Sequence, residues 1–226
     1  MDAKEILAAI QQLPPGERTK VIAALRPSHP LETLWNTSAE IILEAIYRSG
    51  DLTHRGVRGI ITELEFQNRV ISKLKNWKSA EIMGDTPVDF SLSDDVGSVT
   101  VQVKMQRRAK GQPVAAHSQR RSWPVDKYIV EVQKTRGGKK KGQLTRPYAF
   151  GDFDILAVSL HPSTGDWSKF VYTVGRWLVP RPMNKKVIEV FQVVSPVPDE
   201  FWTNDFLQAV EWFRGKKKKT ISYATD

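Results

Sequence analysis

The chain has 226 residues, a net charge of +9 at pH 7 and no cysteine. This length suits one domain of moderate size, and the absence of cysteine excludes disulfides, cysteine-based zinc sites and thiol catalysis. We expect a cytoplasmic protein with no membrane partner, because no apolar run reaches the length of a membrane span and no basic-then-apolar leader is seen. The positive charge favours partners that carry phosphate, above all nucleic acids.

The pattern of the first fifty residues predicts three short helices, and this pattern differs from that of the rest of the chain. Segments 3–13 and 17–25 carry apolar side chains at helical spacing on either side of a Pro-Pro-Gly break. The third helix begins at Leu31 or Thr37 and ends at Ser49. Acidic and basic residues are roughly balanced here, so we expect this part to dimerise or to pack on the core rather than to bind phosphate.

A longer helix is predicted from His54 to Lys78. Two glutamates, Glu63 and Glu65, lie in its first half. Glu63 falls near the apolar stripe with Gln67 and is expected to point towards the sheet, whereas Glu65 falls nearer the solvent side. The apolar stripe consists of Ile60, Leu64, Ile71, Leu74 and Trp77.

The segments that follow predict a β-hairpin with polar residues on one face. Segment 99–106 alternates valine or methionine with polar residues, which is the period of a half-buried strand. Gln102 and Lys104 therefore share the face opposite the core. Asp89 lies in a short strand, 88–92, and the residues between the two strands have the composition of a turn. The hairpin would bring Asp89 beside Gln102 and Lys104.

The sequence Pro87-Val88-Asp89, followed by Gln102-Val103-Lys104, resembles the active site of the PD-(D/E)xK nuclease superfamily, whose fold is called restriction-endonuclease-like. In that family an aspartate and a second acidic residue bind a divalent metal ion, and a lysine orients the attacking water or stabilises charge. Gln102 stands where the family has its second acid. It offers only a neutral carbonyl oxygen, which could orient a water or complete the metal shell.

The missing carboxylate is often supplied in this superfamily by a glutamate on the preceding helix. The resemblance therefore implies Glu63 as the additional metal ligand, with Glu65 as the alternative. It implies a Mg²⁺ ion held by Asp89, Glu63 and the main-chain carbonyl of Val103. Lys104 would position the nucleophile and stabilise the developing negative charge. The implied catalytic residues are Asp89, Gln102, Lys104 and Glu63.

A strongly basic block follows the hairpin. Between Lys104 and Arg146 there are thirteen Lys or Arg residues and two acids. Segment 107–122 is predicted to be a loop over the DNA, and segment 127–134 a strand that leads into a glycine-containing turn. Glycine lets a backbone approach phosphate closely, and arginine can donate two parallel hydrogen bonds to guanine. The expected DNA-binding residues are Arg107, Arg108, Lys110, Arg120, Arg121, Lys134, Arg136, Lys139, Lys140 and Arg146.

The last third of the chain predicts two more strands and a final helix. Segment 153–160 is an almost continuous apolar run, typical of a strand buried on both faces, and segment 170–174 follows it. Asp154 is expected to cap the first of these strands or to pair with an arginine. The aromatic residues of the final helix, 199–214, are expected to serve packing rather than base stacking.

Together these elements predict an α/β (α+β) protein with a central mixed sheet of about five strands flanked by helices. Residues 1–50 would form a helical subdomain and residues 51–226 the nuclease core. The resemblance implies a Mg²⁺-dependent endonuclease that cleaves double-stranded DNA as a homodimer, with a sequence-specific type II restriction endonuclease as the first hypothesis. A structure-specific resolvase or repair nuclease, or a non-catalytic DNA-binding protein with a decayed nuclease core, are the alternatives.

Overall fold

The structure, a computed structural model, describes residues 2–25, 29–80, 82, 86–134, 139–140, 143–144 and 146–223. The chain divides into two compact units, Met1–His54 and Arg55–Asp226. No helix in the described part of the chain is long and apolar enough to cross a membrane.

The first unit is built from short capped helices. Asp2 caps the first of them, since its carboxylate accepts from the backbone N–H groups of Lys4 and Glu5. The predicted third helix is two helices, because Asn36 adopts a left-handed conformation that ends one and Ser38 caps the next. The helices are α1 (Ala3–Gln12), α2 (Pro15–Leu25), α3 (Pro30–Trp35) and α4 (Ala39–Arg48).

Helix α5 spans Asp51–Arg69, so the predicted helix 54–78 was wrong in its second half. A short 3-10 turn, η1 (Ile71–Lys73), and strand β1 (Lys78–Ala80) occupy that half. Asn76 between them has a φ of 64°, which a helix cannot accommodate.

The buried face of α5 also differs from the predicted stripe. Ile60 and Leu64 are 58% and 51% exposed, whereas Thr62 and Phe66 are buried. Gln67, expected to face the sheet, is exposed. One large aromatic ring, that of Phe66, thus anchors this part of the helix. Of the predicted stripe, Ile71, Leu74 and Trp77 do pack on the sheet, and Ile60 and Leu64 do not.

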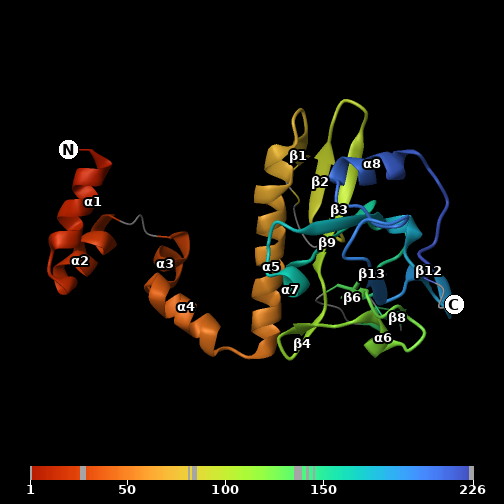
Figure 1. The fold of residues 1–226 in the computed structure, drawn as a ribbon, viewed down its shortest axis with the longest axis horizontal. Coiled ribbons are helices and arrows are strands. Elements are labelled where there is room, and N and C mark those ends of the chain that lie inside the picture. The colour runs from red at the N-terminus through yellow and green to blue at the C-terminus, as the bar shows by residue number, and fades with distance from the viewer. Residues whose placement is uncertain are drawn as a thin grey trace. The chain divides into compact units, whose positions relative to one another are not determined.

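The central sheet has five strands in the order β1-β2-β3-β9-β10. Strands β1, β2, β3 and β9 are labelled in Figure 1. β3 and β9 are parallel and the other neighbours are antiparallel. This mixed sheet with flanking helices confirms the predicted fold class. The predicted hairpin, the doubly buried strand and its antiparallel neighbour are also confirmed, as β2-β3, β9 and β10. The new strands are β2 (Phe90–Ser93), β3 (Ser98–Met105), β9 (Ile155–Ser159) and β10 (Phe170–Val174).

The two faces of the sheet are covered by different elements. Helices α5 and α8 (Phe206–Arg214) cover one face, where Phe66 and Phe206 pack with the valines of β3 (Figure 1). On the other face, the β9 side chains Leu156 and Val158 pack with Val130 and Val194 from two further strands.

The prediction that β3 is half-buried was therefore wrong. Gln102 and Gln106, on the face expected to be open, are each 1% exposed. That face is covered by β6 (Tyr128–Glu131), which pairs with β13 (Phe191–Val194). Gln106 itself bridges to Val130 of β6.

Shorter elements complete the second unit. The predicted loop 107–122 contains a small hairpin and a helical turn, because Lys110 and Gly111 both adopt positive φ values and reverse the chain. The predicted last helix begins later than expected, at Phe206, where Asp205 caps it. The remaining elements are β4 (Arg108–Ala109), β5 (Gln112–Pro113), α6 (Ala116–Gln119), β7 (Lys139–Lys140), β8 (Gln143–Leu144), α7 (His161–Thr164), η2 (Gly175–Trp177), β11 (Pro180–Arg181) and β12 (Asn184–Ile188).

Candidate active site

Asp89 is held firmly at the start of β2. Its backbone N–H donates to the carbonyl of Val101 at 3.0 Å, which extends the β2–β3 ladder by one residue. Its Oδ2 accepts from the Val103 N–H at 2.7 Å and from Gln102 Nε2 at 2.5 Å. Burial raises the pKa of the Asp89 carboxyl, and the nearby Lys104 and the two hydrogen bonds oppose that rise.

Gln102 presents a buried oxygen to the same place. Its Nε2 donates to Asp89 Oδ2 and, at 3.4 Å, to the carbonyl oxygen of Val103. Its Oε1 is buried and has no hydrogen-bond partner among the described residues. A buried acceptor without a partner costs about 1–3 kcal/mol, so this oxygen calls for a donor or a cation.

Lys104 follows on the same face of β3, with only part of its surface open to solvent. Burial lowers the pKa of its ammonium group, while the negative charges of Asp89 and Glu63 act in the opposite direction. The ammonium nitrogen also lies 5.8 Å from the centre of the Tyr148 ring. Lys104 therefore brings a positive charge into the neighbourhood of two carboxylates.

Glu63 of α5 faces this group. Burial and the charge of Asp89 raise the pKa of Glu63 to about 7, with Lys104 opposing the rise. Glu65, two residues along, instead forms an ion pair with Arg69 one turn away. The geometry thus brings Glu63, and not Glu65, to Asp89 and Lys104.

The donor set suits a hard cation. Among the described residues no group of three or more His, Cys, Asp or Glu side chains could hold a metal ion. The site offers two carboxylates, the unpartnered Oε1 of Gln102 and the nearby carbonyl of Val103. These are oxygen donors, which Mg²⁺ prefers, and Mg²⁺ commonly keeps several waters as its remaining ligands.

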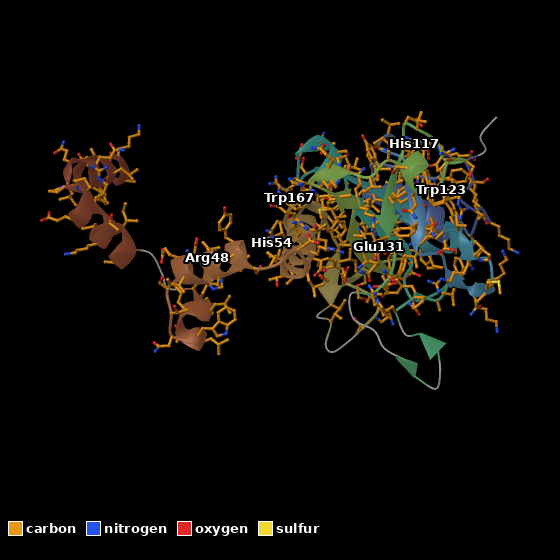
Figure 2. All side chains as sticks on the ribbon, turned by 90° about the horizontal axis from the view of Figure 1, so that it is seen from below. Arg48, His54, His117, Trp123, Glu131 and Trp167 are labelled. Carbon is orange, nitrogen blue, oxygen red and sulfur yellow. The ribbon has the colours of Figure 1, made fainter. Side chains whose placement is uncertain are left out.

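Arg107 and Arg120, both expected to bind DNA, already have protein partners. Arg107 Nη1 donates to Glu131 at 2.5 Å, and its guanidinium lies over the ring of Phe191. Arg120 stacks on Trp123, with its Cζ 4.9 Å from the ring centre; Trp123 and Glu131 are labelled in Figure 2. These contacts orient both arginines at the surface.

The other residues expected to bind DNA differ in their surroundings. Lys134 is half-buried, and its Nζ lies 5.7 Å from the centre of the Tyr148 ring. Arg108 donates to the carbonyl of Gly111 in the β4–β5 hairpin. Lys110, Arg121 and Arg146 are exposed, and Arg146 Nε donates to the carbonyl of Lys134. Arg136 lies outside the described residues, and only the backbone of Lys139 and Lys140 is described.

Two residues near the site were not fully assigned from the sequence. Tyr148, buried at 3% exposure, was not singled out, because it lies in an irregular segment without a periodic pattern. Asp154 was expected to cap its strand or to pair with an arginine. Its charge does act on an arginine, Arg176, whose pKa it raises against the effect of burial. The sequence did not indicate that its Oδ2 also accepts from the N–H and the hydroxyl of Thr100, at 2.9 and 2.8 Å, and so ties β3 to the start of β9.

No protein-family model matches the chain, and no curated protein matches it significantly. One solved structure that matches is titled "The structure of a bacterial homing endonuclease: I-Ssp6803I". The sequence identity is 15% and the TM-score 0.40, over 72% of this chain and 98% of the other. A likeness at this level carries no argument about function, which depends on the residues of the site itself.

Proposed function

We propose that the protein is a Mg²⁺-dependent endonuclease that cleaves double-stranded DNA. One observation carries the proposal: Glu63, Asp89 and Lys104 lie close enough to shift one another's pKa, and Asp89 is hydrogen-bonded to Gln102, whose buried Oε1 has no partner among the described residues. Two carboxylates, a neutral oxygen and a fixed ammonium group are the components of metal-assisted hydrolysis of a phosphodiester.

Asp89 and Glu63 would hold the Mg²⁺ ion together with the carbonyl of Val103. Gln102 would complete the set through Oε1, which has no other partner in the described structure. When bound, the ion would polarise a phosphoryl oxygen and lower the pKa of a bound water. It would also supply the positive charge that two neighbouring carboxylates need in order to be ionised together.

Lys104 would act directly on the reacting phosphate. Its ammonium group is largely buried and has the negative charges of Asp89 and Glu63 nearby, and it would stabilise the charge that develops on the phosphoryl oxygens. Its Nζ would also orient the attacking water by donating a hydrogen bond to it. Burial lowers the pKa of the Lys104 ammonium group, so this group loses a proton more readily than a lysine in water does.

The charge distribution supports DNA as the substrate. Residues 1–54 contain five Lys or Arg and seven Asp or Glu, a net charge of −2. The chain carries +9, so residues 55–226 carry +11. The positive charge therefore belongs to the unit that contains the site, where it would attract and neutralise backbone phosphates.

Within this class we propose a cytoplasmic type II restriction endonuclease that acts as a homodimer. Two copies related by a twofold axis would cut both strands of a symmetric sequence. Discrete fragments from a long duplex would support this, whereas cleavage confined to branched or mismatched DNA would indicate a resolvase or repair nuclease.

A second candidate function is DNA binding without cleavage. The observation that favours it is the hydrogen bond from Gln102 Nε2 to Asp89, since the amide satisfies a carboxylate oxygen that would otherwise face a metal ion. Salt-sensitive DNA binding without Mg²⁺-dependent cutting of any substrate would establish it.

Nicking and linearisation of a supercoiled plasmid test the main proposal. With Mg²⁺ we expect the wild type to cut and Lys104→Ala to cut at least about a hundredfold more slowly, because an interaction made in the transition state is lost. Lys185→Ala, at an exposed lysine of β12, is the matched control for loss of one positive charge and should cut like the wild type. Equal cleavage by Lys104→Ala and wild type would overturn the assignment.

A further inference from the structure

A second lysine lies against the same aromatic ring as Lys104. Tyr148 is 3% exposed and packs edge-on against Phe153, with ring centres 5.4 Å apart. Lys104 Nζ lies 5.8 Å from the centre of the Tyr148 ring, and Lys134 Nζ lies 5.7 Å from it. Both distances are within the range of a cation–π contact.

The position of Lys134 is not explained by an ion pair with a neighbouring carboxylate. Lys134 forms no ion pair with a carboxylate among the described residues, although Glu131 is close in the sequence. Glu131 is already occupied, since it accepts from Arg107 and from Gln133. Lys104 has the carboxylates of Asp89 and Glu63 nearby, whereas the ammonium group of Lys134 has no such partner in the described part of the chain and is able to bind an anion.

The backbone holds Lys134 in place. Its N–H donates to the carbonyl of Arg146 at 2.9 Å, and its carbonyl accepts from Arg146 Nε at 3.2 Å. Gln133 and Pro147 form the adjacent bridge. The backbone of Lys134 is therefore paired with the irregular segment that leads directly into Tyr148, which holds the backbone of the lysine close to the ring.

We propose that Lys134 is a second phosphate-binding residue of the site and that Tyr148 is a positioning residue for both lysines. Lys134 Nζ would donate to a non-bridging oxygen of the reacting phosphate or of the phosphate next to it. The ring of Tyr148 would supply a desolvated, electron-rich surface that keeps the two ammonium groups pointed at the same stretch of backbone. This inference rests on the proposed nuclease function and deepens it.

Two measurements on the full chain test the role of Lys134. One is the single-turnover cleavage rate with saturating enzyme and Mg²⁺. The other is the salt dependence of duplex DNA binding in EDTA. Lys134→Ala should cut at least about tenfold more slowly, since one donor to the transition state is lost. It should also reduce the slope of log K against log[salt] by about 0.9, as expected for one phosphate contact. Lys185→Ala should leave both quantities unchanged.

Variants of Tyr148 separate positioning from simple structure. Tyr148→Leu removes the ring and should lower the cleavage rate at least about tenfold, whereas Tyr148→Phe keeps the ring and should recover most of that loss. A thermal melt of each variant identifies any rate loss caused by unfolding. Equal losses in the Phe and Leu variants, with both folded, would overturn the role assigned to the ring.

The outcomes distinguish this inference from the proposed function. If the wild type cuts but Lys134→Ala cuts equally fast, Lys134 has no part in the reaction. If the rate falls while the salt slope is unchanged, Lys134 does not contact phosphate and the inference is wrong. If the wild type binds DNA but cuts nothing, the nuclease proposal fails, and the salt slope of Lys134→Ala still decides the phosphate contact.

Discussion

Replacing Glu63 by glutamine should make the protein more stable and less active. The pKa of Glu63 is raised from 4.5 to about 7, mainly by burial and then by the charge of Asp89. At about 1.4 kcal/mol per pH unit this corresponds to roughly 3 kcal/mol of destabilisation when Glu63 is ionised. Because the side chain is partly open to solvent, we expect a smaller effect, roughly 1–2 kcal/mol.

The sign follows from proton linkage. Between pH 4.5 and about 7 the folded state holds a proton on Glu63 that the unfolded state has released, so the free energy of unfolding falls as the pH rises through this window. Glu63→Gln lacks this dependence. Its advantage over the wild type should therefore be small at pH 4.5 and reach its full value by pH 8.5.

Urea denaturation in EDTA at these two pH values, followed by the plasmid assay with Mg²⁺, measures both effects. Glu65→Gln is the matched control, since Glu65 is on the same helix and pairs with Arg69. It should not become more stable at pH 8.5 and should keep its cleavage. A Glu63→Gln protein that is no more stable than the wild type at pH 8.5 would refute the desolvation argument, and full cleavage would refute Glu63 as a metal ligand.

Two further predictions concern the fold that carries the site. Phe66→Ala should lower the free energy of unfolding by about 3–5 kcal/mol, because its ring is buried among four aromatic rings with centres 5.4 to 6.3 Å away. Urea titration would check this, with half-exposed Leu64→Ala as the control; equal losses would contradict it. Arg214 holds the pKa of Asp94 at about 2 through a hydrogen-bonded ion pair, so its stabilising effect should be present above about pH 4 and disappear as the pH falls towards 2. A stability difference between wild type and Arg214→Ala that stays constant down to pH 2 would argue against this.

The hairpin that carries the candidate site could be predicted from local patterns. The alternation in β3 and the turn composition before it predict the register that pairs Phe90 with Val101. In that register Asp89 lies beside Gln102, and Lys104 follows two residues later on the same face of β3. These contacts depend on residues close in the sequence, which is why the pattern was sufficient. The catalytic and metal-binding roles of these residues stay predictions.

Contacts between distant segments could not be predicted in the same way. Thr62 and Phe66 form the buried face of α5 because an aromatic cluster from the sheet and α8 surrounds Phe66, and helical periodicity within α5 does not contain that information. Tyr148 lies near both Lys104 and Lys134, and the pairing of Lys134 with Arg146, twelve residues away in the sequence, brings the second lysine to the ring. Asp154 reaches Thr100 only because β3 and β9 lie side by side in parallel.

Digestion of a long phage DNA with Mg²⁺, followed by sequencing of the fragment ends, tests the central claim most directly. We expect discrete fragments with a common sequence at their ends from the wild type. Asp89→Asn, which weakens the best-anchored carboxylate of the site, and the wild type in EDTA should give no fragments. Fragments produced equally by Asp89→Asn, or no cleavage by the wild type of linear, supercoiled or branched DNA, would contradict the account.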